Sequence, residues 1–457
     1  MSLTLFHKIW NAHRIADIAD GALILIDRVL LHERTGGVAL RSLAAAGRQL
    51  AAPDSVFATM DHVVDTRPGR TDETIMPTGR DFIRATRAEA IAAGIRLFDI
   101  GDPGQGIVHV ISPEQGIVLP GLTLVCPDSH TGTQGGLGAL AWGIGSTEAE
   151  HALATRTLRV KRPKTMRITI DGRLQAGVTA KDLALALIAR FGARGGAGHV
   201  IEFAGETIRS FATEARMTLC NMATEFGAFT ALIAPDEATI DYLRGRPFAP
   251  TDAAWDAAVV SWRGLVTDAD AQFDAELAID ADEVSPMISW GTNPAQSLPI
   301  SGVVPADADP RATSYMGLEP GERLLGQPID GAFIGSCTNS RVSDLRRAAA
   351  LLRGRRVALG VRAICVPGSS AVKLAAEEEG IDRLFLAAGF EWRESGCSMC
   401  FYSGGESFGP GQRVISSTNR NFESRQGPGT RTHIASPETV VASALAGHIA
   451  DPREIAR

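Results

Sequence analysis

Ala332-Phe-Ile-Gly-Ser-Cys-Thr-Asn-Ser-Arg341 places an apolar strand, a thiol and a polar turn in direct succession. A helical pattern follows over 343–353, then a second apolar strand over 362–366 and a second helix over 371–379. Strands that alternate with helices pack as parallel sheets covered by helices. The stretch therefore predicts an α/β fold with Cys337 at the end of a buried strand.

Two further cysteines stand sixty residues later, in Glu394-Ser-Gly-Cys-Ser-Met-Cys400. Three thiolates can hold three corners of a four-iron cluster, because each iron takes one sulfur ligand from the protein. A fourth cysteine ligand is not evident, so one iron would stay open. An open iron is a Lewis acid with room for water and substrate, and this favours chemistry on the cluster over electron transfer.

Cys397 and Cys400 alone leave three alternatives: a redox dithiol, half of a zinc site, or a cluster loop. A thioredoxin-like motif would stand early, after a first strand, and a structural zinc would need a second ligand pair close by. Cluster ligation is favoured once Cys337 is counted. The remaining cysteines, at positions 126, 220 and 365, are interpreted as core residues.

The composition excludes several classes of protein. The chain has 457 residues, 45% of them apolar and 21% charged, with a net charge of −7, so no electrostatic case for nucleic acid exists. No signal peptide is recognisable and no apolar stretch is long enough for a membrane span. Six cysteines form no disulfide framework, and we expect a reducing, cytoplasmic setting.

We expect three α/β domains, over residues 1–164, 165–290 and 291–457. In the first domain, 107–111 and 122–126 are predicted strands. In the second, a helix is predicted over 179–191 with Thr179 as its cap.

Several candidate acid–base residues stand inside predicted strands or at their ends. His109 lies within the apolar run 107–111, and Asp128, Ser129 and His130 follow the run 122–126. The candidates are Asp61 and His62, His109, Asp128 with Ser129 and His130, and Asn221 with Glu225. A single histidine in an apolar strand is more often a core residue than a catalyst. Three histidines with possible carboxylate partners favour proton transfer, because a carboxylate fixes the tautomer of an imidazole and raises its basicity.

The stretch Ser417-Thr-Asn-Arg-Asn-Phe-Glu-Ser-Arg-Gln426 carries two arginines in a turn-rich segment. Arg420 and Arg425 suit recognition of a carboxylate, because a guanidinium can bind it through two parallel hydrogen bonds. The alternative is a solvated loop.

Together these segments resemble the aconitase superfamily, and within it the isopropylmalate isomerases. The likeness runs nearly end to end and includes Phe57-Ala-Thr-Met-Asp-His62, Gln105-Gly-Ile-Val-His109, Asp128-Ser-His-Thr131, Arg216-Met-Thr-Leu-Cys-Asn221, Trp290-Gly-Thr-Asn-Pro294, Gly335-Ser-Cys-Thr-Asn-Ser-Arg341, Gly396-Cys-Ser-Met-Cys400 and Asn419-Arg-Asn-Phe422.

The resemblance implies one [4Fe-4S] cluster on Cys337, Cys397 and Cys400, with one iron not ligated by protein. It implies three compact α/β domains of aconitase type around the cluster, without the fourth, swivelling domain. In this family that domain is a separate small subunit, so a heterodimer is implied, and the serine base would belong to the small subunit.

The resemblance also implies a hydro-lyase of leucine biosynthesis that isomerises 2-isopropylmalate to 3-isopropylmalate through isopropylmaleate. His62, steadied by Asp61, would protonate the leaving oxygen. By analogy His109 pairs with Asp128 and His130 with Glu225. The residues that would bind the dicarboxylate substrate or lie near the cluster are Ser129, Asn221, Asn419, Arg420 and Arg425, with His32 as a looser candidate.

Two departures from the family pattern concern the substrate: the run Phe401-Tyr-Ser-Gly-Gly-Glu-Ser-Phe408, and Ser424 in place of glycine. A paralogue acting on citraconate/2-methylmalate or another branched malate is therefore the second hypothesis. An RNA-binding iron sensor and a zinc hydrolase that uses the same cysteines are two further hypotheses. The acidic net charge argues against the sensor.

Overall fold

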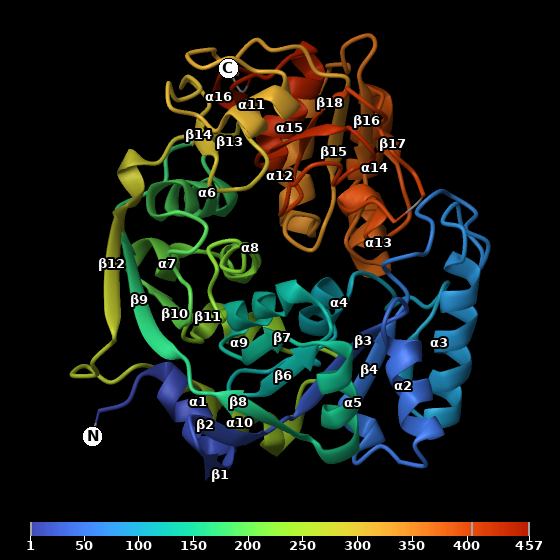
Figure 1. The fold of residues 1–457 in the computed structure, drawn as a ribbon, viewed down its shortest axis with the longest axis vertical. Coiled ribbons are helices and arrows are strands. Elements are labelled where there is room, and N and C mark those ends of the chain that lie inside the picture. Colours follow the sequence, from blue (N-terminus) through green and yellow to red (C-terminus); the bar gives the residue numbers. More distant parts are fainter. Residues whose placement is uncertain (1, 404, 456–457) are drawn as a thin grey trace. The chain divides into compact units, whose positions relative to one another are not determined.

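The computed structural model describes residues 2–403 and 405–455 (Figure 1). It divides into two compact units, each built from separate pieces of the chain. The first unit comprises residues 1–61, 81–172 and 196–280, and the second comprises 62–80, 173–195 and 281–457. Each unit is described by itself below.

A five-stranded parallel sheet forms the centre of the first unit, in the order β5-β4-β3-β6-β7. Its strands β3, β4 and β6 are largely buried and consist mostly of apolar residues. The bounds are β3 Arg28–His32, β4 Val56–Thr59, β5 Arg96–Phe98, β6 Thr123–Cys126 and β7 Leu140–Gly143, with helices α1 Leu5–His13, α2 Gly36–Ala45, α3 Gly79–Ala93, α4 Val108–Glu114 and α5 Ser146–Thr155.

The strand predicted over 107–111 is wrong, because this run begins helix α4. His109 therefore lies on a helix and is 1% exposed. Four apolar residues around a single histidine fit a buried strand and a helix buried on all sides equally well, so periodicity could not separate the two. The strand predicted over 122–126 is confirmed as β6.

A second parallel sheet of the first unit has the order β11-β10-β9-β12. Three short strands form a separate antiparallel sheet, β1-β2-β8. The bounds are β1 Arg14–Ile18, β2 Gly21–Leu25, β8 Thr157–Lys161, β9 Lys164–Asp171, β10 His199–Ala204, β11 Thr230–Leu232 and β12 Ala275–Asp280, with helices α7 Glu206–Ser210, α8 Thr213–Met222, α9 Glu237–Leu243 and α10 Asp252–Arg263.

The second unit is built on a five-stranded parallel sheet in the order β17-β16-β15-β18-β19, with helices such as α14 and α15 against it (Figure 1). Its strands are β15 Gly331–Ile334, β16 Arg362–Cys365, β17 Glu391–Trp392, β18 Arg413–Ser416 and β19 Arg431–Ile434, and a hairpin joins β13 Met287–Ser289 to β14 Ser297–Pro299. Its helices are α6 Ala180–Phe191, α11 Pro310–Met316, α12 Val342–Leu352, α13 Ser370–Glu378, α14 Ile381–Ala388, α15 Pro437–Ala446 and α16 Pro452–Ile455.

Parallel sheets with helices confirm the predicted α/β fold class. Helix α6 begins after Thr179, whose side chain accepts the N–H of Lys181, as its sequence predicts. The three-domain division over 1–164, 165–290 and 291–457 stays a prediction. Within the described part of the chain, no helix has the length and apolar character needed to cross a bilayer.

Candidate functional site: a cysteine centre in the second unit and acid–base pairs in the first

Cys337 lies in the turn between β15 and α12, as the sequence predicts, and is 8% exposed. The preceding Ser336 has a φ of +80°, a left-handed conformation that is costly for a residue with a Cβ. Its Oγ lies 4.0 Å from Sγ of Cys337 and 3.3 Å from Sγ of Cys400. Two of the three candidate ligands therefore flank one serine hydroxyl.

Cys397 and Cys400 lie at the two ends of a single helical turn. The N–H of Cys400 donates to the carbonyl of Cys397 at 2.9 Å. Between them, Ser398 has a φ of +47° and its hydroxyl accepts a hydrogen bond from Thr66 Oγ1 at 2.9 Å. A second left-handed non-glycine residue beside a candidate ligand indicates that packing fixes this turn in shape, as is typical of functional sites.

The sulfur atoms have hydrogen-bond donors around them. Asn419 Nδ2 donates to Sγ of Cys337 at 3.6 Å, and Arg425 Nη2 points to Sγ of Cys400 at 3.8 Å. All six cysteines lie in the described part of the chain, and each is buried and outside any disulfide. Three buried thiols with amide, guanidinium and hydroxyl donors around them suit an anionic iron–sulfur centre, whose sulfurs accept such contacts.

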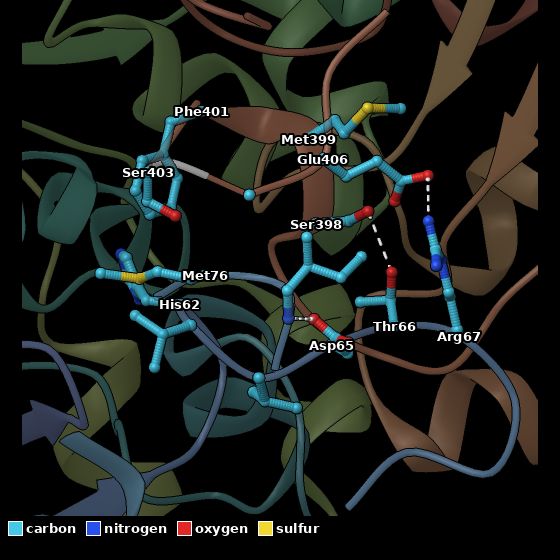
Figure 2. A pocket seen from close by; sticks show the side chains of 14 residues that line it. His62, Asp65, Thr66, Arg67, Met76, Ser398, Met399, Phe401, Ser403 and Glu406 are labelled. Atoms are coloured by element: carbon cyan, nitrogen blue, oxygen red, sulfur yellow. Dashed lines mark hydrogen bonds and ion pairs between the residues drawn. The ribbon is translucent and has the colours of Figure 1, made fainter. Parts of the chain in front are cut away.

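His62 is the first residue of the second unit and lies next to the cysteine centre, which is the group formed by Cys337, Cys397 and Cys400. Its Nδ1 lies 3.9 Å from Sγ of Cys397, and its ring packs against Phe401 with 5.6 Å between centroids. His62 and Phe401 line a pocket together with Thr66, Ser398 and Glu406 among others (Figure 2). The imidazole of His62 thus borders both a candidate metal ligand and the pocket.

The unusual segment after Cys400 is held in place by contacts of Phe401 and of Glu406. Phe401 lies against His62, and the Arg425 guanidinium is 5.7 Å from its ring. Glu406 accepts from Arg393 at 2.7 and 3.0 Å, from Arg67 at 3.3 Å, and also from Arg362. Burial opposes ionisation of Glu406, but the hydrogen bonds of Arg393 and Arg362 prevail and lower its pKa to about 2.

Ser424, the other departure from the family pattern, has a φ of +67°. That conformation explains why glycine suits this position, since a glycine has no Cβ to clash there. Here the serine makes compensating contacts: its Oγ accepts from the N–H of Gly429 at 3.1 Å, and its N–H donates to Tyr315 Oη at 2.7 Å.

Four of the predicted acid–base residues of the first unit form two imidazole–carboxylate pairs. His109 Nε2 lies 3.0 Å from Oδ1 of Asp128, and His130 Nε2 lies 2.9 Å from Oε1 of Glu225. The N–H of His130 also donates to Oδ1 of Asp128 at 2.7 Å. Asp128 thus contacts both histidines, and each imidazole has a carboxylate partner that can fix its tautomer.

Other predicted residues of the first unit have structural contacts as well. Asn221 donates to Thr133 Oγ1 at 2.8 Å, and Ser129 Oγ lies 3.3 Å from Nδ1 of His130. Oδ2 of Asp61 accepts the N–H of Val108 at 2.8 Å. Asp61, Glu33 and His32 each offer a ligand-type atom within 4.8 Å of the others.

The cysteines interpreted as core residues are fully buried. Burial raises the pKa of the Cys220 thiol and of the Cys365 thiol, because the thiolate is disfavoured away from water. Cys126 ends β6 with no exposed surface. Burial therefore makes the thiols of Cys220 and Cys365 poor nucleophiles, as is typical of structural cysteines.

Sequence reasoning missed several residues of the second unit. Thr66, Glu406 and Lys181 have no motif of their own and acquire a role only through contacts with residues distant in the chain. The nearest signal was the atypical segment 401–408, which includes Glu406. Arg420 directs its carbonyl to Thr418 Oγ1 at 3.4 Å, and its proposed role as a carboxylate ligand stays a prediction.

Comparison with known proteins finds relatives that cover most of this chain. A 3-isopropylmalate dehydratase large subunit of Bradyrhizobium diazoefficiens is 52% identical over 99% of this chain and 97% of its own length. The crystal structure of aconitase X from Thermococcus kodakaraensis, in its holo-form, covers 91% of this chain and 89% of its own, at 13% identity and a TM-score of 0.48.

A family model also matches nearly the whole chain. The model describes the aconitase family (aconitate hydratase) and covers residues 7–447, which includes all the candidate ligands and acid–base residues. Together with the Bradyrhizobium relative, it identifies this chain as a member of the aconitase family.

Proposed function

We propose that this chain is the cluster-bearing large subunit of a hydro-lyase that converts 2-isopropylmalate to 3-isopropylmalate through isopropylmaleate, in leucine biosynthesis. Two findings support the class of reaction: family membership, and the relative that is 52% identical over nearly the whole chain and is named a 3-isopropylmalate dehydratase large subunit. The observation that carries the proposal is the contact of His62 with Cys397, because it joins a proton donor to a candidate metal centre.

Membership of this family implies an iron–sulfur cluster, and we assign it to Cys337, Cys397 and Cys400. When bound as [4Fe-4S] with one iron not ligated by protein, it would supply a Lewis acid for the substrate hydroxyl and carboxylate. The buried thiols and the donors of Ser336, Asn419 and Arg425 support that assignment.

The protein's own residues handle protons and orientation. His62 Nε2 is directed away from the Cys397 contact, which Nδ1 makes, and can carry the proton that goes to the leaving hydroxyl oxygen. Arg420 and Arg425 bind substrate carboxylates through paired hydrogen bonds. The His109–Asp128 and His130–Glu225 pairs keep each imidazole in one tautomer, as orientation of water and substrate requires.

A small partner subunit belongs to the proposal, since the Bradyrhizobium relative is named a large subunit. The partner would supply the swivelling domain and the base that removes a proton from the substrate carbon. A water would then add back at the neighbouring carbon, which moves the hydroxyl group and leaves the overall composition of the substrate unchanged.

The test is anaerobic purification followed by reconstitution with candidate small subunits. We expect bound iron and inorganic sulfide, the visible absorption of an iron–sulfur protein, and turnover of isopropylmalate only after a small subunit is added. Faster turnover of citraconate would replace the substrate assignment and leave the reaction class intact. Zinc near one equivalent per chain without inorganic sulfide would overturn the proposal in favour of a zinc hydrolase.

A further inference from the structure

Lys181 is the least expected buried residue of the second unit. It is the second residue of α6 and has no exposed surface. Lysine is almost never fully buried unless it is paired with an opposite charge. The first turn of a helix is also a poor place for a cation, because the helix dipole is positive there.

The hydrogen bonds of Lys181 go to neutral groups. Its Nζ donates to the carbonyl of Ser417 at 3.0 Å and to the carbonyl of Thr418 at 2.6 Å. Within residues 2–403 and 405–455, no carboxylate oxygen pairs with Nζ at ion-pair distance. The buried ammonium therefore has no protein counter-ion in direct contact.

The carboxylates of the neighbouring Asp182 and Asp344 interact with groups other than Lys181. Asp182 accepts from Thr179 Oγ1 at 2.7 Å and from the N–H of Met287 at 2.8 Å, and burial raises its pKa to about 7. Asp344 forms an ion pair with Arg347 at 2.7 Å. Neither carboxylate is available to neutralise Lys181 fully.

The carbonyls that Lys181 holds belong to the turn next to the cysteine centre. Ser417 Oγ is hydrogen-bonded to both the N–H and the carbonyl of Gly335 at 3.1 Å, two residues before Cys337. Asn419, the next residue of that turn, donates to Sγ of Cys337. Lys181 is thus connected to Cys337 from both sides.

The electrostatics agree with that placement. Burial lowers the pKa of Lys181 to about 7, and negative charge at Cys400 and Cys337 is the strongest influence that raises it. An iron–sulfur cluster on three thiolates adds net negative charge at the same place, and this would favour the ammonium form.

We propose that Lys181 is a positioning residue that compensates the negative charge of the cluster and holds the 417–419 turn against Cys337. The proposal rests on the proposed function only in requiring that Cys337, Cys397 and Cys400 carry a cluster. A cation beside a cluster stabilises its reduced form and resists oxidation, so Lys181 should raise the midpoint potential and slow the loss of iron in air.

The test compares two variants in the anaerobically purified full chain. Lys181→Met keeps the length of the side chain and removes charge and hydrogen bonds together. Lys181→Gln removes the charge and keeps an N–H donor. Lys373→Met is the matched control, since Lys373 belongs to the same unit but pairs with Glu377 at 2.8 Å on its own helix.

We expect a more negative midpoint potential and faster iron loss in air for both Lys181 variants, with Lys373→Met like the wild type. A wild-type potential in a folded Lys181→Met or Lys181→Gln variant would overturn the proposal. For Lys181→Gln, this result would show that Lys181 acts only as a hydrogen-bond donor and not through its charge. If the Lys181 variants bind no cluster although their apo forms have the melting temperature of the wild-type apo form, the result supports the proposal, because the charge of Lys181 is then needed for the cluster to assemble.

Apo forms that unfold would assign Lys181 to folding and also overturn the proposal. Failure of the proposed function itself looks different: the wild-type chain would then contain no iron or sulfide.

Discussion

Nδ1 of His62 lies 3.9 Å from Sγ of Cys397, although the two residues are 335 positions apart in the chain. The imidazole is held there on one face by the ring of Phe401. One nitrogen faces the cysteine centre, and the pocket lies beside the ring (Figure 2). This contact sets the first prediction, because it separates the role of the imidazole from that of the thiols.

Replacement of His62 by glutamine should lower kcat by about 10²–10⁴-fold, the usual contribution of a general acid. Iron and sulfide content should stay at the wild-type level, because three thiols remain. Steady-state kinetics with the small subunit and metal analysis on the same sample check both. His448→Gln, an exposed histidine of the same unit, is the control. Unchanged turnover would remove His62 from its role.

Cys337→Ser should abolish cluster retention and activity together, since a serine oxygen is a poor iron ligand compared with a thiolate. Cys365→Ala is the matched control: Cys365 is also buried in the second unit, on β16, and should be needed only for packing. Iron analysis and visible spectra after anaerobic purification decide between them. Full retention of iron by Cys337→Ser would contradict the ligand assignment.

Asp128→Asn should slow turnover by about 10²-fold, because its carboxylate contacts both His109 and the N–H of His130 and an amide cannot fix their protonation in the same way. Both the maximal kcat and the shape of its pH profile should change. Asp20→Asn, at an exposed ion pair of the same unit, should alter neither. A profile that only loses amplitude through unfolding would assign Asp128 to stability.

Glu406→Gln should destabilise the second unit by about 1.5–3 kcal/mol, the range for hydrogen bonds to charged groups. The pKa of Glu406 falls from 4.5 to about 2 on folding, so the unfolded chain binds more protons between these values. Its stabilising contribution is therefore complete above pH 4.5 and is lost as the pH falls toward 2. Denaturant unfolding over this range should show a steeper loss for the wild type than for the variant, and parallel curves would contradict the pKa.

At position 424, alanine should cost more stability than glycine. Both variants lose the hydrogen bond from Ser424 Oγ to Gly429, worth about 0.5–1.5 kcal/mol, but only alanine keeps the strain of a φ of +67°. Urea unfolding of Ser424→Ala and Ser424→Gly measures the difference. Equal stability of the two variants would show that the left-handed backbone costs nothing here.

Local pattern was sufficient for much of the fold. The strand before Cys337, helix α12 after it and the cap of α6 at Thr179 follow from short apolar runs and capping residues, which act within a few positions. At 107–111, four apolar residues around a single histidine showed neither a clear helical period nor a clear strand period, and the helix that holds His109 was missed.

The sequence by itself determined which residues carry the chemistry: three cysteines in two specific motifs, and histidines beside carboxylates. Only the tertiary structure decided which further side chains adjoin them, such as Thr66 at Ser398 and Lys181 at the carbonyls of Ser417 and Thr418. The physical reason is range. Backbone preferences and hydrophobic periodicity act over a few residues, whereas a buried ammonium or a left-handed serine is tolerated only because distant segments pack around it.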